Sequence, residues 1–352
     1  MQFFLEKDIE EIIKFLEKEI YIFEDKRILI TGGQGFLGRY FSQVFMYLNK
    51  SFLKKKINIV VLDNLKTAGT LGELKLNNPN FEFYNHNVIE DFKYEKKIDF
   101  IIHAAGIASP YYYRKWPLET LEVATIGLKN SLNLAKKNNA KLIFFSSSEI
   151  YGDPDPSNVP TLESYNGNVS CLGDRASYDE SKRLGETLVK IFSEQYGVKA
   201  SIIRPFNVYG PGMQKLDYRV LPNFASKIVV GSNLSVYGNG NQTRTFCYIT
   251  DAITGFLKVL LSGLNGEPYN IGNPNPEISM LELIEKIKQL YPDKAIDYKI
   301  IKHPDTYPAD EPQRRCPNID KAKIHLNYNP QIKIDEGLSR FMNWALEAYN
   351  DN

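Results

Sequence analysis

The sequence predicts an α/β fold in which a doubly wound parallel sheet is joined to a smaller C-terminal lobe. Short apolar runs alternate with longer helical stretches, and the runs lack the polar alternation of a sheet with one face in water. After about Pro211, turns rich in Gly, Asn and Pro separate shorter helices. We therefore expect an N-terminal helix in residues 1–25, the sheet domain in 26–210 and the smaller lobe in 211–352, with some strands and helices exchanged between the lobes.

Charge patterning in the first 25 residues excludes a signal peptide or a membrane span, because Lys and Glu recur every few positions. Between these charges, Ile9, Ile12, Ile13 and Leu16 follow helical spacing. This pattern predicts a short amphipathic helix that packs on the body of the protein or on a partner subunit.

The strands of the expected sheet are continuous apolar runs, as burial on both faces requires. They are RILIT (27–31), INIVVLD (57–63), FEFYN (81–85), FIIHAA (100–105), KLIFFSSS (141–148) and ASIIRPFN (200–207).

Overall composition narrows the partners that the protein can have. The chain has 352 residues, 43% of them hydrophobic, which is enough to bury a full core. Its 43 Lys and Arg against 42 Asp and Glu leave a charge of +1, so no global field attracts nucleic acid or an anionic membrane. The three cysteines are far apart and form no C-x-x-C, which argues against a disulfide framework or a zinc site. We expect a cytoplasmic protein without a bound metal.

A glycine-rich turn follows the first expected strand and precedes a helical segment. In TGGQGFLG, Gly32, Gly35 and Gly38 allow a tight turn and a close approach of the backbone to a pyrophosphate at the helix N-terminus. The next strand ends in Asp63, whose carboxylate can bind the adenosine ribose and repel a 2′-phosphate. The predicted sheet domain, 26–210, is therefore a Rossmann domain that binds NAD in preference to NADP.

Tyr178 and Lys182 form a candidate catalytic pair, since residues four apart on a helix share one face. A nearby ammonium favours a phenolate, so we expect Lys182 to lower the pKa of Tyr178 and make it a base. The same spacing occurs twice elsewhere, but only Tyr178 opens a convincing helix one crossover after the run KLIFFSSS. The context therefore selects this pair.

Ser147 and Ser148 end that run and Glu149 follows it, at the end of a parallel strand where doubly wound sheets bind ligands. Ser147 could orient the hydroxyl that Tyr178 deprotonates. Beside a ketone, Glu149 could remove the α proton or position a leaving group. Alternatively, Glu149 could have only a structural role and cap the following turn.

These residues resemble the extended short-chain dehydrogenase/reductase family of NAD-dependent epimerases and dehydratases, and among them the UDP-glucuronate decarboxylases. The resemblance spans about 26–345. It rests on LDN (62–64), HAAGIASPYYY (103–113), SSSEIYGD (146–153), ESYNGNV (163–169), DRASYDESKR (174–183), RPFNVYGPGM (204–213), DYRVLPNF (217–224), QTRTFCYITD (242–251) and DEPQRRCPNIDKAK (310–323). Four residues depart from the decarboxylase pattern, namely Asn87, Trp116, Ala124 and Gly212, the last at a position where the decarboxylases have Arg.

The resemblance implies a tightly held NAD, a nucleotide sugar bound by the lobe 211–352, and a homodimer formed through the helices that follow Lys115 and Ser177. Its catalytic positions are Ser147, Ser148, Glu149, Tyr178 and Lys182. Its cofactor positions are Gly32, Gly35, Phe36, Leu37, Gly38, Asp63, Asn64, Ala104, Ala105, Tyr178 and Lys182. Tyr113 would contact the sugar, Asn207 the diphosphate, and Arg219, Arg244 and Arg315 the anionic parts of the substrate.

The implied reaction is oxidation at sugar C4 with NAD, loss of CO₂ from the resulting β-keto acid, and return of the hydride. Three alternatives stay open at this point. A 4,6-dehydratase would use Glu149 to remove the C5 proton while water leaves C6, a 4-epimerase or 4-dehydrogenase would need no carboxylate, and an NAD-sensing scaffold would need no chemistry at all.

Overall fold

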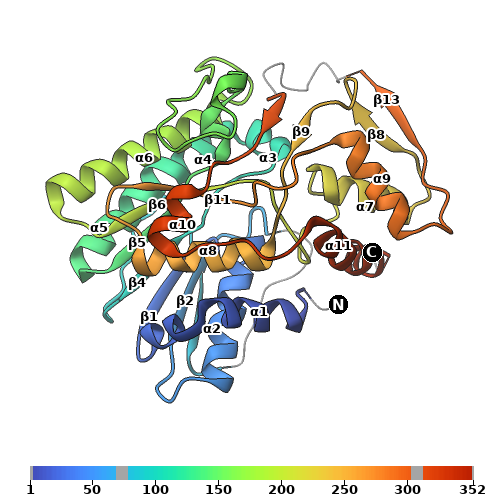
Figure 1. The fold of residues 1–352 in the computed structure, drawn as a ribbon. Helices are drawn as coiled ribbons and strands as arrows, with labels where there is room; N and C mark the ends of the chain where they lie inside the picture. Colours follow the sequence, from blue (N-terminus) through green and yellow to red (C-terminus); the bar gives the residue numbers. More distant parts are fainter. Residues whose placement is uncertain (1–2, 69–77, 303–311, 351–352) are drawn as a thin grey trace.

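Seven parallel strands form the central sheet (Figure 1). The computed structural model describes residues 3–68, 78–302 and 312–350. In spatial order the strands are β11 (Pro268–Ile271), β6 (Ala200–Pro205), β5 (Lys141–Phe145), β4 (Phe100–His103), β1 (Arg27–Thr31), β2 (Asn58–Asp63) and β3 (Phe81–Asn85). The predicted doubly wound fold is confirmed, and several strands are shorter than the apolar runs because the chain leaves the sheet to enter the site.

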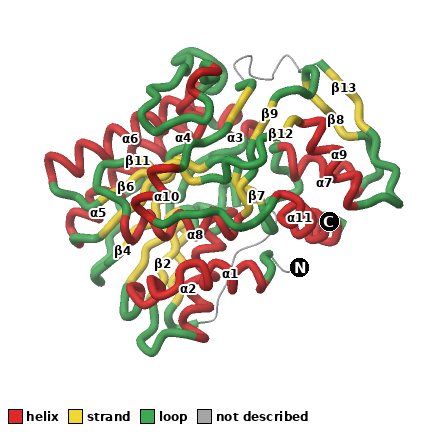
Figure 2. The backbone as a smooth tube through the Cα atoms, viewed as in Figure 1, coloured by secondary structure: helices red, strands yellow, loops and turns green. Residues whose placement is uncertain are grey.

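Both faces of the sheet are buried, which explains the uninterrupted apolar runs. Ile28 and Ile30 of β1 belong to one core with α2 (Phe36–Ser51) and α8 (Ile249–Ser262). Leu29, between them in sequence, points into a second core with α5 (Leu128–Asn138) and α6 (Ala176–Tyr196). Figure 2 shows the strands between these layers of helices.

The chain beyond residue 211 contributes to both parts of the molecule. β11 lies beside β6 at the edge of the main sheet, and α8 covers one face of it. The smaller lobe lies at the right of Figure 1, around the two-stranded sheet β8–β13. Part of the chain after residue 211 therefore packs with the central sheet.

The remaining elements are short or belong to the smaller lobe. They are α3 (Pro110–Lys115), α4 (Pro117–Glu122), the π-helix η2 (Val123–Gly127), the 3₁₀ helices η3 (Ser148–Tyr151) and η4 (Pro156–Asn158), β7 (Val208–Tyr209), α7 (Val220–Val229), β8 (Leu234–Tyr237), β9 (Thr243–Arg244), β10 (Cys247–Tyr248), β12 (Ile278–Ser279), α9 (Met280–Leu290), β13 (Tyr298–Ile301), β14 (Arg314–Arg315), α10 (Asp320–Leu326) and α11 (Ile334–Ala348). Within the described ranges, every helix is too short or too polar to cross a bilayer.

The N-terminal segment forms α1 (Glu6–Leu16) followed by the 3₁₀ helix η1 (Glu17–Phe23). Ile9, Ile12 and Leu16 are buried in the same core as α2 and α8. The apolar face of the helix therefore packs on the body of its own chain.

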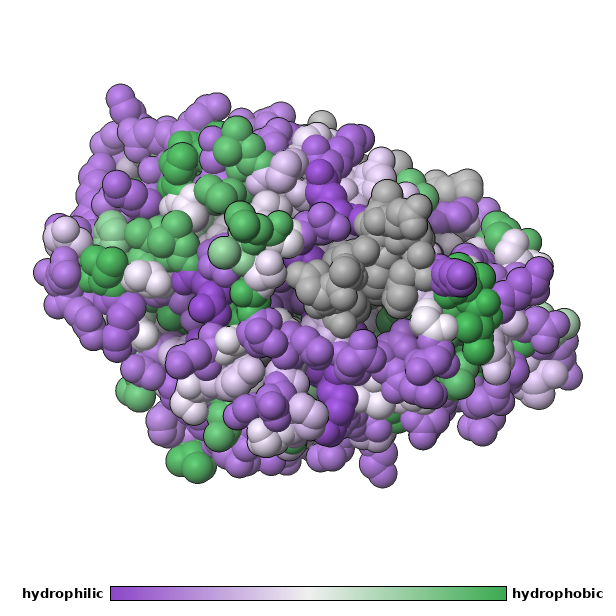
Figure 3. Space-filling model, turned by 90° about the horizontal axis from the view of Figure 1, so that it is seen from above, coloured by the Kyte–Doolittle hydropathy of each residue, from purple (hydrophilic) through white to green (hydrophobic). Residues whose placement is uncertain are grey.

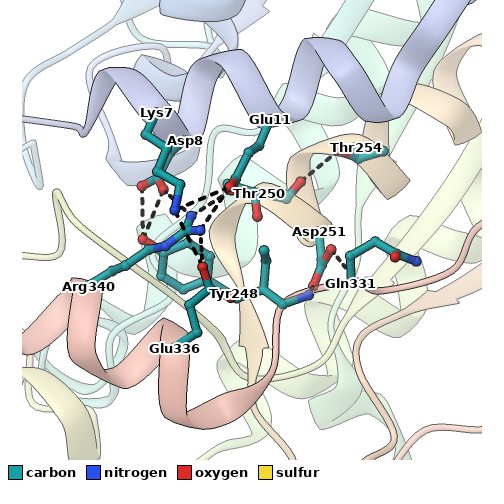
Figure 4. A network of polar contacts seen from close by, with 11 residues as sticks. Lys7, Asp8, Glu11, Tyr248, Thr250, Asp251, Thr254, Gln331, Glu336 and Arg340 are labelled. Atoms are coloured by element: carbon teal, nitrogen blue, oxygen red, sulfur yellow. Dashed lines mark hydrogen bonds and ion pairs between the residues drawn. The ribbon is translucent and has the colours of Figure 1, made fainter. Parts of the chain in front are cut away.

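A buried polar network fixes the other side of α1 (Figure 4). The Asp8 carboxylate is fully buried and accepts hydrogen bonds from the Tyr248 hydroxyl at 2.9 and 3.1 Å. It also accepts one from Arg340 Nη1 at 3.0 Å, and Arg340 donates to Glu11 at 2.6 and 2.8 Å. Because Tyr248 lies in β10 and Arg340 in α11, the network ties the N-terminal helix to the C-terminal lobe.

The ring of Phe3 lies against Gly212, one of the four departures from the decarboxylase pattern. A Cβ placed on Gly212, which has φ +92°, would lie 2.5 Å from the Phe3 ring. The guanidinium of Arg39 lies 4.8 Å from the centre of the same ring. The Phe3 ring of the N-terminal segment thus covers the position where the decarboxylases have Arg.

Candidate active site

Two adjoining cavities lie at the carboxyl ends of the central strands, where a doubly wound sheet binds its ligands. The larger has a volume of about 640 Å³ and the smaller about 260 Å³. Both cavities are lined in part by Phe36, Leu37, Ala104 and Arg219.

The smaller cavity lies over the glycine turn between β1 and α2. A Cβ on Gly32, which has φ +67°, would lie 2.7 Å from the backbone of Ala105, so only glycine fits this contact. Asp63 at the end of β2 accepts backbone hydrogen bonds from Gln34 at 2.9 Å and Leu65 at 2.8 Å. Burial raises the pKa of this carboxyl, and the two backbone donors and Arg39 oppose the rise.

The lining of the smaller cavity fits the predicted dinucleotide. It includes Gly32, Gly35, Phe36, Leu37, Gly38, Asp63, Asn64, Ala104 and Ala105. The turn leads into the N-terminus of α2, where the first N–H groups of a helix have no acceptor within the helix, as a pyrophosphate site requires. Asn87, one of the four departures from the decarboxylase pattern, also lines this cavity.

The larger cavity contains the predicted catalytic residues. β5 ends at Phe145, and Ser147, Ser148 and Glu149 follow it directly, while Tyr178 and Lys182 face the same space from the start of α6. The Ser147 hydroxyl accepts a hydrogen bond from the backbone N–H of Glu149 at 3.2 Å, which caps η3. Two segments far apart in sequence thus meet as expected.

The predicted effect of Lys182 on Tyr178 is wrong for the protein alone. Burial raises the pKa of Tyr178 to about 12, against a hydrogen bond with Ser147 that lowers it. The Lys182 ammonium donates to the backbone oxygen of Phe145 at 2.8 Å and lies 5.7 Å from the centre of the Tyr178 ring. Burial lowers the pKa of Lys182 to about 8. A phenolate therefore needs further positive charge, which the oxidised nicotinamide ring of a bound NAD would supply.

Glu149 lies between two arginines. Arg315 holds it with two contacts, Nη1 to Oε1 at 2.5 Å and Nη2 to Oε2 at 2.7 Å. Arg175 forms a second ion pair with Oε2. Both guanidinium groups are buried, with 6% and 8% of the Arg175 and Arg315 side chains exposed. The carboxylate is therefore already paired before any substrate binds.

The predicted substrate residues also line the larger cavity. The ring of Tyr113 stacks on that of Tyr178 with centroids 5.3 Å apart. Asn207 donates to the backbone oxygen of Thr245 at 2.8 Å.

The three predicted arginines already have partners within the protein. Arg244 and Arg315 are register neighbours in the strands β9 and β14, and Arg244 donates to backbone oxygens while Arg315 pairs with Glu149. Arg219 is paired with Asp217, its Nε lying 2.9 Å from Oδ1.

Sequence analysis did not single out Arg175 or Arg114, which also line the larger cavity. With Arg219, Arg244 and Arg315, they make the lining rich in guanidinium groups, which bind phosphates and carboxylates bidentately. The signal for Arg175 was its spacing, since Arg175 and Asp179 are four apart and flank Tyr178. Among the described side chains, no His, Cys, Asp and Glu residues gather in a group of three or more suited to a metal ion.

Comparisons with known proteins agree with this arrangement. The sequence model of the NAD dependent epimerase/dehydratase family matches residues 28–272. The chain is 40% identical over 314 residues to UDP-glucuronic acid decarboxylase 3 of Arabidopsis thaliana, an alignment that covers 89% of this chain and 86% of that protein. It is 37% identical over 358 residues to UDP-glucuronic acid decarboxylase 1 of Xenopus tropicalis, covering 97% and 81% of the two chains. Among solved structures, the UDP-N-acetylglucosamine 4-epimerase from Methanobrevibacter ruminantium M1 in complex with UDP-N-acetylmuramic acid superimposes with a TM-score of 0.78 at 25% identity, covering 92% of this chain and 99% of that one.

Proposed function

The chain belongs to the NAD-dependent epimerase/dehydratase family, and on this premise we propose that it is an NAD-dependent decarboxylase of nucleotide-linked glucuronate, with UDP-glucuronate as its substrate. The observation that carries the choice of reaction is the pairing of Glu149 with Arg175 and Arg315. A dehydratase needs a carboxylate that is free to take the C5 proton. Decarboxylation needs no base at C5, because the electrons left by CO₂ delocalise into the neighbouring ketone.

The residues around the larger cavity each have a part in this reaction. NAD in the smaller cavity would accept the hydride from sugar C4. Tyr178 takes the proton of the C4 hydroxyl, and Ser147 orients that hydroxyl toward it. The C4 ketone is then β to the substrate carboxylate, which leaves as CO₂. After a proton from water reaches C5, Tyr178 returns its own proton to the C4 oxygen as that carbon is reduced.

Product analysis separates this proposal from its rivals. We expect UDP-glucuronate to lose CO₂, and mass spectrometry of the nucleotide product would detect the loss. If UDP-glucose instead loses water, the protein is a 4,6-dehydratase. Inversion at C4 without loss of mass identifies an epimerase, and a 4-ketone that persists identifies a dehydrogenase. If none of these nucleotides is turned over, the NAD-sensing scaffold is the remaining alternative.

Cofactor preference gives a prediction at Asp63. We propose that its carboxylate binds the adenosine ribose of NAD and repels the 2′-phosphate of NADP. We expect Asp63→Ala to weaken NAD binding and to narrow the difference between the affinities for NAD and NADP, as measured by calorimetric titration. Because both carboxylate oxygens also hold backbone N–H groups, Asp63→Asn is the companion variant that keeps one acceptor. An unchanged preference in both variants would place the ribose contact elsewhere.

We propose a cytoplasmic homodimer that forms through the faces of α4, η2 and α6. Apolar side chains that are about one-third to two-thirds exposed occupy these elements, namely Leu118, Leu121, Ile126, Leu184 and Ile191. In Figure 3 apolar atoms gather at the left end of the molecule, the end at which Figure 1 places α6. Contiguous exposed apolar surface is typical of subunit interfaces.

The dimer proposal predicts a change of mass in solution. We expect Leu184→Glu to convert the dimer to a monomer in light scattering coupled to gel filtration, because the charge would be buried at the interface. Ile324→Glu is the matched control, since Ile324 is also exposed but lies on α10. If Leu184→Glu has the mass of the unaltered protein, α6 is not in the interface.

A further inference from the structure

Four charged side chains of alternating sign form a line, and three of them, Arg315, Glu149 and Arg175, line the larger cavity. Arg315 contacts Glu149, Glu149 contacts Arg175, and Arg175 Nε lies 3.4 Å from Oδ2 of Asp179. Asp179 has 3% of its side chain exposed, and Glu149 has 17%. Of the two acids in the line, Glu149 is therefore the one that a ligand in the cavity can approach.

The charge of Glu149 matters because of the substrate proposed above. A uronate nucleotide carries a carboxylate on the carbon that a C5 base would face, so this carboxylate would come close to Glu149. Two like charges at short separation repel strongly in a site of low polarity. Such a substrate can bind only if the charge of Glu149 is compensated.

Arg175 is better placed than Arg315 to give this compensation throughout the reaction. Arg315 lies in β14 beside Arg244, and we expect both to contact the anionic parts of the nucleotide, which would draw Arg315 away from Glu149. Arg175 precedes the first residue of α6, and its second acidic neighbour, Asp179, is a weak competitor because burial raises the pKa of Asp179 well above its ordinary value. Arg175 thus remains the partner of Glu149 when the substrate is present.

We propose that Arg175 determines specificity for an acidic sugar: by neutralising Glu149, it allows a nucleotide sugar with its own carboxylate to bind beside it. This inference rests on the proposed function. It assigns Arg175 a positioning and charge-balancing part, without contact to the reacting atoms.

Binding measurements in a background without turnover test the inference. In Tyr178→Phe protein, the affinities for UDP-glucuronate and UDP-glucose are measured by calorimetric titration, with and without Arg175→Met. We expect Arg175→Met to lower the affinity for UDP-glucuronate by about tenfold or more and the affinity for UDP-glucose by less than about threefold. Arg175→Lys, which keeps a cation, should retain most of the preference for the acid.

A double variant separates charge balance from a structural effect. In Arg175→Met/Glu149→Gln the repelling charge is gone, so UDP-glucuronate binding should recover. Lys190→Met removes an exposed cation from the same helix and should change neither affinity. Equal weakening of both nucleotides, or no recovery in the double variant, overturns the inference.

The Tyr178→Phe protein with Arg175 intact distinguishes a failure of the Arg175 inference from a failure of the proposed function. If Tyr178→Phe protein with Arg175 intact binds UDP-glucuronate no better than it binds UDP, the acidic substrate itself is wrong. Loss of selectivity only on substitution of Arg175 supports the inference.

Discussion

Replacing Tyr178 by Phe should leave NAD bound and lower turnover of UDP-glucuronate by about a hundredfold or more, a loss on the scale of general acid–base catalysis. The substitution removes only the hydroxyl group, and the ring that stacks on Tyr113 stays. Because most of the predicted cofactor positions line the smaller cavity and are unchanged, binding of NAD should persist. Steady-state rates and the NAD content of the purified variant measure the two effects separately.

Tyr196→Phe is the matched control for this variant. Tyr196 is at the far end of the same helix and is half exposed, so its hydroxyl should not affect turnover. Near-normal turnover of Tyr178→Phe would remove Tyr178 from the mechanism.

Replacing Arg340 by Leu should lower the free energy of unfolding by about 3–5 kcal/mol, the usual cost of leaving a buried charge unpaired. Asp8 is fully buried and, among the described residues, would keep the Tyr248 hydroxyl as its side-chain donor, with Glu11 nearby. Lys7→Leu is the control, since Lys7 is exposed and its ion pair with Glu336 should contribute at most about 1 kcal/mol. Chemical denaturation of both variants measures the difference, and equal losses would show that the network of Asp8 contributes little.

The pH dependence of the Arg340→Leu effect has a definite sign. Burial raises the pKa of Asp8 from 3.8 to about 6, while Arg340 lowers it. A carboxyl with a raised pKa in the folded state binds more protons there, so its contribution to stability falls as the pH rises from about 4 to about 6. Removing Arg340 raises this pKa further. The destabilisation should therefore be smaller at about pH 5 than at about pH 8.

The sheet and the cofactor turn could be predicted from the sequence because both depend on local patterns. Strands buried on two faces must be continuously apolar, and Gly32 must be glycine because its Cβ would meet a neighbouring backbone. The seventh strand, β11, was not predicted. Its four residues, PYNI, carry too little apolar pattern to separate a buried strand from a turn.

That the candidate catalytic residues share one cavity could also be predicted from context, since the end of β5 and the start of α6 meet at one edge of the sheet. The protonation of Tyr178 and the ion pairing of Glu149 could not be predicted from the sequence. Whether Lys182 lowers the pKa of Tyr178 depends on burial and on where the ammonium points, and here it points to the backbone oxygen of Phe145. The pairing of Glu149 with Arg315 joins residues 166 positions apart, a contact that spacing alone does not reveal.

Decarboxylation of UDP-glucuronate is the activity proposed for this protein. The most direct test is to incubate the purified protein with UDP-glucuronate, without added reductant, and to follow CO₂ release together with the mass of the nucleotide product. We expect CO₂ release with formation of a UDP-pentose, which requires that the hydride removed at C4 be returned. Retention of the carboxylate, with a neutral hexose nucleotide dehydrated or oxidised instead, would contradict it.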